Sequence, residues 1–229
     1  GIKFANYLIE PLMNNSKTYG RDITKVGTYY RRSHNAVIAH AFPVIVSRLK
    51  ELGTKNILGI GASSIELLLV ISKEIQPSIC MAIATDEEVS EITEEKKGHS
   101  PDEGAVKIFA ADVGWPERFP KETAAAEALV GTSVFHDFYP EDRLISVLEK
   151  YKKNFPGQRL FIVEFDVPNW NDIRKKDVSA VRYFASISRL THSFKRESGP
   201  QPQDMWVNAI EKSGWRLTQI KNLQYGLVI

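Results

Sequence analysis

Hydrophobic and polar residues follow two different patterns along the chain, and the change comes near residue 53. Before it, HNAVIAHAFPVIVSRLKEL (34–52) carries apolar residues at helical spacing, Gly53 suits a helix end, and Pro43 should kink or divide the segment. From Asn56 onward, short apolar runs of strand length alternate with segments of helix length. We therefore predict an N-terminal helical segment over 1–52 and an α/β domain over 53–229.

The pattern over 53–229 predicts a doubly wound α/β fold. The predicted strands are 56–61, 78–85, 106–113 and 129–138, a fifth that follows a turn within 156–167, and two more between 214 and 229. The predicted helices are 63–75, 86–97, 140–155, 172–190 and 203–212. The first five strands are separated by segments that can cross over, so they should run parallel. The last two are joined by too few residues for a crossover and should form an antiparallel C-terminal hairpin.

Polar and small residues gather where these predicted strands end. In sheets of this kind, ligands bind beyond the carboxyl ends of the strands, near the point where the strand order reverses. The residues concerned are Gly59, Gly61, Ala62, Ser63, Thr85, Asp86, Asp112, His136, Asp137, Glu164 and Asp166. Their convergence on one crevice is a stronger indication of a site than any single motif.

Composition narrows the classes of function. Hydrophobic residues make up 43% of the chain and charged residues 25%, and the net charge is +2, so neither a nucleic acid nor an anionic membrane is demanded. No apolar run reaches the roughly 18–20 residues of a membrane span. The single cysteine, Cys80, lies in an apolar run and should be a small buried hydrophobe. We expect a cytoplasmic protein.

The order of parts over 56–229 resembles the class I S-adenosylmethionine (SAM)-dependent methyltransferases. VFHDFYPEDRLISVLEKYKKNFPGQRLFIVEFD (134–166) is similar to the plant-type O-methyltransferases: His-Asp-aromatic, an acidic turn, an amphipathic helix, a Pro-Gly turn and an apolar strand ending in Glu. QDMWVNAIEKSGWRLTQIK (203–221) resembles the last helix and strand of that family. The resemblance implies a Rossmann-like, seven-stranded sheet and SAM as cofactor.

The first-strand motif departs from the family pattern. The family usually carries an acidic residue followed by Gly-x-Gly-x-Gly. Here Gly59 stands at the place of the acid, Gly61 is retained, and Ser63 and Ile65 occupy the next two glycine places. Gly61 still permits a tight turn, and Ser63 is small enough for a ligand to approach the backbone closely. Ile65 should narrow the site.

The resemblance also assigns carboxylates to the next two strands. Ala84 stands where the family usually holds the ribose hydroxyls with an acid, so Asp86 or Glu87 should substitute. Asp112 matches the acid that flanks the adenine. The implied cofactor-binding set is Gly59, Gly61, Ala62, Ser63, Asp86, Asp112 and Val113.

His136 is the candidate general base. The histidine of the family's His-Asp-Trp motif has this role, and an imidazole with a pKa of about 6.5 can take a hydroxyl proton as the methyl group transfers. Asp137 could orient the ring or be structural. A histidine that is merely hydrogen-bonded at a strand end is the alternative interpretation.

His192 raises a second possibility. A smaller related group, the 2-oxo-acid C-methyltransferases that act on phenylpyruvate or 2-ketoarginine, includes members in which two histidines hold a non-haem iron. His136 and His192, 56 residues apart (192 − 136), fit that pattern loosely. A metal chelated by the oxo acid would favour its enolate. The alternative for His192 is a helix-surface histidine.

The substrate residues are predicted in the N-terminal segment. Arg31 and Arg32, which follow Tyr30, could bind a substrate carboxylate through a guanidinium fork. A solvated basic helix face is the alternative.

The sequence thus predicts a SAM-dependent methyltransferase of small molecules, favouring carbon methylation of a 2-oxo acid in natural-product biosynthesis, with iron as a possible second cofactor. The alternatives are a small-molecule O-methyltransferase and a non-methylating relative with an altered cofactor pocket. A nicotinamide dehydrogenase is disfavoured because the Gly-x-Gly-x-x-Gly spacing fails. Relatives usually dimerise through a longer helical N-terminal region, so the resemblance also implies a homodimer.

Overall fold

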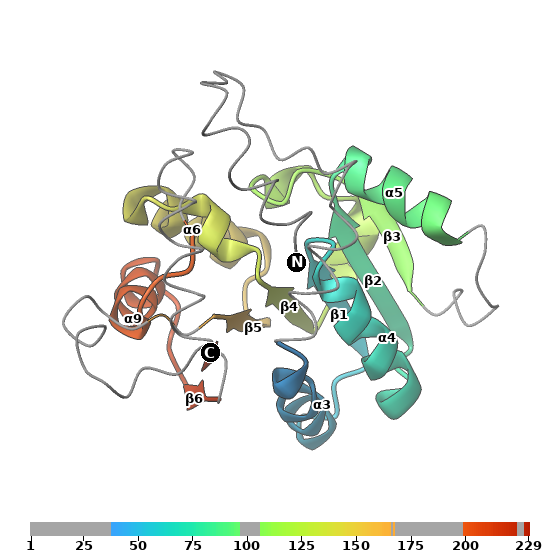
Figure 1. Cartoon of the computed structure of the whole chain (residues 1–229), viewed down its shortest axis with the longest axis horizontal. Coiled ribbons are helices and arrows are strands. Elements are labelled where there is room, and N and C mark those ends of the chain that lie inside the picture. Colours follow the sequence, from blue (N-terminus) through green and yellow to red (C-terminus); the bar gives the residue numbers. More distant parts are fainter. Residues whose placement is uncertain (1–37, 97–105, 166, 168–198, 224–226) are drawn as a thin grey trace, which may run out of the picture.

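A computed structural model describes residues 38–96, 106–165, 167, 199–223 and 227–229 of the chain. A sheet lies between two layers of helices (Figure 1). Its parallel part has the order β3-β2-β1-β4-β5, which confirms the predicted α/β, Rossmann-like sheet. These strands are β1 (Asn56–Ile60), β2 (Ile79–Ala84), β3 (Lys107–Ala110), β4 (Ala128–Thr132) and β5 (Arg159–Glu164).

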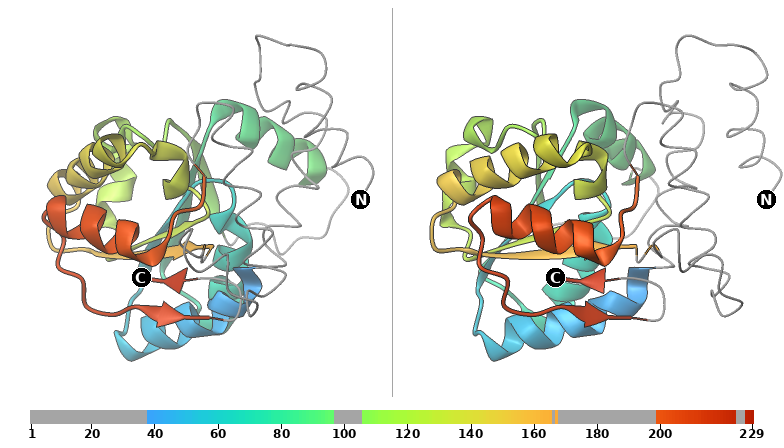
Figure 2. Two further views of the ribbon diagram at one scale, coloured as in Figure 1. Left: turned by 60° about the vertical axis from the view of Figure 1, so that its left-hand side comes forward. Right: turned by 90° about the vertical axis from the view of Figure 1, so that its left-hand side faces the viewer.

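Both faces of the sheet are covered by helices. The helices are α3 (Phe42–Glu51), α4 (Ser64–Ile75), α5 (Asp86–Lys96), α6 (Glu141–Asn154) and α9 (Gln203–Lys212). Successive residues of a strand point to opposite faces, so Ile57 packs with residues of α3 and α4, and Leu58 packs with residues of α6 and α9. Figure 2 shows α6 and α9 together on one side and α3 on the other. Burial on both faces explains why β1 is apolar throughout.

Pro43 divides the N-terminal helical stretch, as its position predicts. A short 3-10 helix, η1 (Ala39–Ala41), precedes α3, and Pro43 lies in the first turn of α3. A proline is tolerated there because the first-turn N–H groups have no partner within the helix. Ile45 and Leu49 of α3 are fully buried in the same apolar cluster as α4, so this helix is part of the core of the domain.

The chain after β4 differs from the prediction. The sequence predicts one strand over 129–138, but β4 ends at Thr132 and a 3-10 helix, η5 (Phe135–Phe138), follows. Ser133 separates them with a φ of 49°, a left-handed conformation that breaks an extended strand. This turn sets the direction in which His136 leaves the sheet.

The C-terminal strands are short. The strands β6 (Lys221–Asn222) and β7 (Leu227–Val228) lie beyond β5 in the order β5-β7-β6, and both of their pairings are antiparallel. Residues 214–220, which the sequence predicts to be extended, form no strand. The predicted helix over 172–190 lies outside the described residues.

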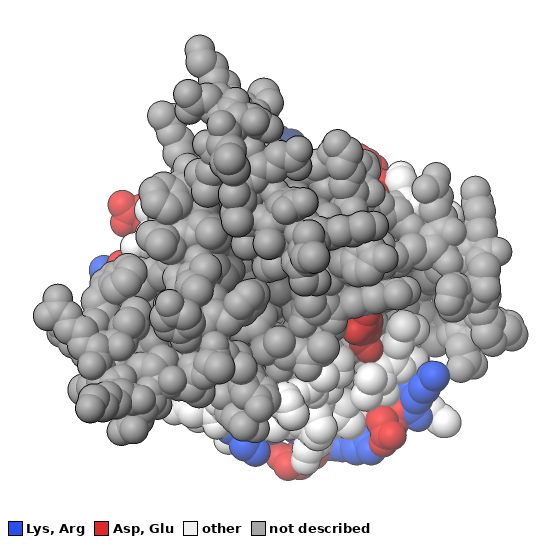
Figure 3. All heavy atoms as spheres, viewed as in Figure 1, with Lys and Arg blue, Asp and Glu red and all other residues white. Residues whose placement is uncertain are grey.

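The surface carries charges of both signs. On the face shown in Figure 3, Lys or Arg atoms adjoin Asp or Glu atoms along the lower edge, where Figure 1 shows α3. Two exposed ion pairs involve residues of α3, Arg48–Glu51 at 2.8 Å and Lys50–Glu74 at 3.0 Å. Exposed pairs of this kind contribute little to stability. In the described ranges, no helix combines the length and apolar content needed to cross a membrane.

Candidate functional site

The carboxyl ends of the parallel strands meet at one edge of the sheet. The register pairs Ile60 at the end of β1 with Ile83 of β2 and with Gly131 of β4, and Thr132 with Val163 of β5. The loops that follow these strands therefore start side by side. They carry the residues that the sequence singles out.

The turn after β1 requires a glycine at position 61. Gly61 has a φ of 81°, and its N–H donates to the carbonyl oxygen of Ile83 at 2.8 Å. A Cβ on Gly61 would lie 2.9 Å from Val134 Cγ2. The turn is thus held between β2 and the loop after β4, and Ala62 and Ser63 lead from it into α4.

We expect Gly61→Ala to destabilise the fold by about 1–3 kcal/mol, because alanine must adopt a left-handed backbone and displace Val134. Gly157→Ala is the matched control, since Gly157 also has a positive φ of 89° but a Cβ there would meet no described atom within 4 Å. Urea unfolding of both variants measures the difference. Equal losses would show that Val134 adds no constraint.

The place of the family's acid at Gly59 is filled by other side chains. A Cβ on Gly59 would lie 2.6 Å from Leu68 Cδ1 and 3.1 Å from Ser64 Cβ. The Ser64 hydroxyl donates to the carbonyl oxygen of Ile60 at 2.6 Å and accepts from the N–H of Thr132 at 3.1 Å. Gly59 is therefore a packing position, and no side chain at 59 fits without rearrangement of α4.

Ile65, which the sequence predicts to narrow the site, is 7% exposed and belongs to the apolar cluster of α3 and α4. It therefore contributes to the core next to the turn.

The end of β2 presents carboxylates in the first turn of a helix. Ala84 is fully buried, and Thr85 caps α5 through a capping box in which Glu88 Oε2 accepts from the Thr85 N–H at 2.9 Å. Asp86 and Glu87 are exposed, and within the described part of the chain neither carboxylate makes a hydrogen bond or ion pair. These acceptors suit the hydroxyl groups of a ligand.

The loop after β3 is fixed by hydrogen bonds. Asp112 is exposed, and its Oδ1 accepts from the Gly114 N–H at 2.8 Å. The Tyr151 hydroxyl of α6 donates to the carbonyl oxygen of Val113 at 2.7 Å. Burial, and to a smaller extent the charge of Asp112, raises the pKa of Tyr151 well above its usual value, so Tyr151 stays a neutral donor. The second carboxylate oxygen of Asp112 can accept a hydrogen bond from a ligand.

His136 and Glu164 form a buried pair at the centre of the edge. The side chains are 1% and 0% exposed, and His136 Nδ1 lies 2.8 Å from Glu164 Oε2. Glu164 Oε1 also accepts from the backbone N–H groups of Phe135 at 3.1 Å and His136 at 3.3 Å. With Glu164 acting as the acceptor toward the ring, as it does toward these two N–H groups, Nδ1 carries the proton and Nε2 is the basic nitrogen.

Asp137, which the sequence predicts either to orient the ring or to be structural, lies beside the other ring nitrogen. It lies on the other side of the imidazole, with Oδ1 3.4 Å from His136 Nε2, and its side chain is 34% exposed. Glu164 is the residue that fixes the tautomer. The sequence places Glu164 at the crevice but gives no sign of this pairing, which depends on the turn at Ser133.

The other predicted site residues lie outside the described residues: Tyr30, Arg31, Arg32, Asp166 and His192. Among the residues that are described, no group of three or more His, Cys, Asp or Glu side chains could hold a metal ion. The predicted iron site, which needs His192, therefore stays a prediction. Cys80 has the expected structural role, because it is 7% exposed and burial raises the pKa of its thiol to about 12.

No protein-family model and no curated protein matches the sequence. Solved structures do match. The mitomycin 7-O-methyltransferase MmcR is 16% identical with a TM-score of 0.67, and the match covers 90% of this chain and 57% of that one. PigF with SAH is 14% identical with a TM-score of 0.64, covering 83% and 53%. A pericyclic reaction enzyme is 11% identical with a TM-score of 0.59, covering 76% and 42%.

These matches show that the chain has the class I methyltransferase fold. The chain spans about half the length of the structures that it matches.

Proposed function

We propose that this chain binds SAM and transfers its methyl group to an oxygen nucleophile of a small molecule. The observation that carries the proposal is the His136–Glu164 pair, because it leaves a basic nitrogen at the edge where the strands end. The names of MmcR, an O-methyltransferase, and of PigF with SAH support the same activity and cofactor.

The residues at this edge fit the cofactor by their chemistry. The turn at Gly61 and the small residues Ala62 and Ser63 let the cofactor approach the backbone closely. The carboxylates of Asp86 and, through its second oxygen, Asp112 can accept hydrogen bonds from hydroxyl and amino groups. Val113 adds an apolar contact. Gly59 is excluded from a direct role because Leu68 and Ser64 fill the space beside it.

In the proposed reaction, His136 Nε2 accepts the proton of the acceptor hydroxyl. Glu164 holds the ring in the productive tautomer and stabilises the imidazolium that forms. Asp137, 3.4 Å from Nε2, adds a second negative charge beside that cation. When bound, SAM supplies an electrophilic methyl group. The burial of His136 keeps bulk water from the proton transfer.

The direct test is calorimetry with SAH, followed by measurement of SAH release from SAM with a panel of phenols and alcohols. Saturable SAH binding and acceptor-dependent release support the proposal. If SAH gives no heat at millimolar concentration, the fold uses this edge for another purpose.

Replacing Asp86 with alanine should weaken SAH binding about 10- to 100-fold, the equivalent of about 1.5–3 kcal/mol for hydrogen bonds to a charged group. Asp142→Ala is the matched control, because Asp142 is also an exposed aspartate in the first turn of a helix, α6. Calorimetry with SAH measures both variants. If the two variants bind SAH equally, Asp86 is not a ligand.

Carbon methylation of a 2-oxo acid, which the sequence favours, is the second candidate, and it depends on His192. This activity would require a bound metal, so it should be lost on chelation and regained when ferrous iron is added back. O-methylation with His136 as base should be indifferent to chelation. The same assay, run with a 2-oxo acid and with a phenol, separates the two.

A non-methylating role is the third candidate, and the packing around Gly59 is what favours it. The chain also resembles a pericyclic reaction enzyme in fold. For such a role, SAM would not be consumed with any acceptor, whether or not SAH binds.

A further inference from the structure

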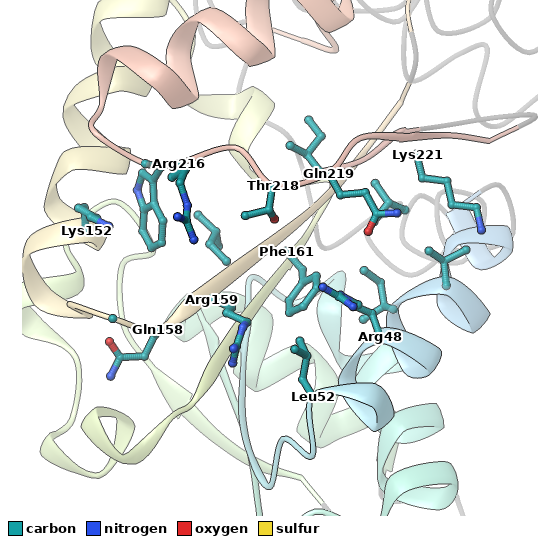
Figure 4. A pocket seen from close by; sticks show the side chains of 17 residues that line it. Arg48, Leu52, Lys152, Gln158, Arg159, Phe161, Arg216, Thr218, Gln219 and Lys221 are labelled. Atoms are coloured by element: carbon teal, nitrogen blue, oxygen red, sulfur yellow. The ribbon is translucent and has the colours of Figure 1, made fainter.

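A cavity lies at the opposite edge of the sheet, where the strands begin. Its volume is about 550 Å³, and its walls come from α3, the start of β5, the end of α6 and the C-terminal segments 215–221 and 228–229 (Figure 4). Arg159 begins β5 and Glu164 ends it, so five residue steps (164 − 159) of roughly 3.3 Å place the two ends about 16 Å apart. The cavity is therefore separate from the site of His136.

The lining of this cavity is cationic. Arg48, Lys152, Arg159, Arg216 and Lys221 contribute to it, and its lining within the described chain includes no aspartate or glutamate. Figure 4 shows Arg216 and Lys221 on the C-terminal segment and the other three residues on other segments around the cavity. Their recruitment from α3, α6, β5 and the C-terminal segment distinguishes the lining from the basic face of a single helix.

The five cations differ in how they are paired. Arg48 is paired with Glu51 at 2.8 Å, and the Lys152 ammonium lies 4.8 Å from the centre of the Trp215 ring. Arg159, Arg216 and Lys221 make no side-chain hydrogen bond or ion pair within the ranges that the structure describes. Three such charges around one cavity favour a dianion over a singly charged carboxylate.

The cavity also has an apolar wall. Leu52, Phe161, Trp215 and Ile229 contribute to it. Cavities of roughly 300–1,000 Å³ that combine apolar walls with a few polar groups are typical small-molecule sites. The ligand therefore needs a flat or apolar body next to its charged group.

We propose that this cavity binds a small organic phosphate with an apolar body. The phosphate lies between Arg159 and Arg216, which Figure 4 shows on the same side of the cavity, since a guanidinium fork matches phosphate oxygens in charge and geometry, and Lys221 adds positive charge from the other side. The apolar body packs on Phe161 and Trp215.

The test is calorimetry at low ionic strength with three probes: phenyl phosphate, benzyl alcohol and inorganic phosphate. The full chain should bind phenyl phosphate saturably and more tightly than either of the other probes. Combining Arg159→Gln with Arg216→Gln should weaken phenyl phosphate binding at least about tenfold. Lys153→Gln is the matched control, because Lys153 is exposed on α6 next to Lys152 and does not line the cavity. Added salt should weaken binding.

Three results would overturn the proposal: benzyl alcohol binding as tightly as phenyl phosphate, inorganic phosphate binding as tightly, or the double variant binding like the wild type. The substituted arginines are exposed, so thermal unfolding of the double variant should match the wild type. SAH binding should be unchanged in the double variant, which keeps this test independent of the proposed methyl transfer.

Discussion

Replacing His136 with glutamine is expected to lower the rate of methyl transfer by about 10²–10⁴-fold, the usual contribution of a general base. The amide of glutamine can still donate a hydrogen bond toward Glu164, so the variant should fold. It cannot accept a proton at neutral pH, so the acceptor hydroxyl stays protonated. The measurement is SAH release at saturating SAM with the best acceptor of the panel.

His40→Gln is the matched control, since His40 is an exposed histidine of η1 and lies outside the proposed machinery. SAH affinity should be close to wild type in both variants, because the lost interaction belongs to the proton transfer. A rate within threefold of the wild type for His136→Gln would falsify the assignment of His136 as the base.

Replacing Glu164 with alanine is expected to destabilise the protein by about 3–5 kcal/mol, because each buried hydrogen-bond donor left without an acceptor costs about 1–3 kcal/mol. The substitution leaves three buried donors without their acceptor: the N–H groups of Phe135 and His136 and the Nδ1–H of His136. It also leaves a cavity between β5 and η5. Urea unfolding followed by tryptophan fluorescence measures the loss.

Glu164→Gln separates packing from tautomer control. The glutamine oxygen can still accept from the two backbone N–H groups, so the loss of stability should be smaller than in Glu164→Ala. Its amide nitrogen would face Nδ1 as a donor and favour the other tautomer of His136, so methyl transfer should fall nearly as far as in the alanine variant. If Glu164→Gln keeps wild-type activity, Glu164 acts only on stability.

Much of the fold can be predicted because the strands β1, β2, β4 and β5 are short apolar runs bounded by turn residues. The two misses have different causes, a single backbone turn and a segment that finds no partner strand. The left-handed turn at Ser133 ends β4 early and starts η5, and serine gives little sign of such a conformation in a sequence. The segment 214–220 alternates as a strand would, yet it lines a cavity without pairing.

The sequence predicts the position of the candidate site but not its pairings. The order of predicted strands and helices places His136 after the fourth strand, at the carboxyl edge of the sheet. The contact with Glu164 joins residues 28 apart through the turn at Ser133, and no spacing rule predicts it. The packing of Leu68 against Gly59 cannot be predicted from the sequence either. An unusual glycine in a motif does not indicate which side chain fills the space beside it.

The hydroxyl of Ser64 contacts the backbone of both β1 and β4, through Ile60 and Thr132. For protein engineering this means that positions 60, 64 and 132 are one unit. A library that randomises the glycine turn to alter ligand preference would also change how two central strands are joined. Such a library should keep Ser64 constant, or vary it together with Thr132, so that loss of folding is not mistaken for loss of recognition.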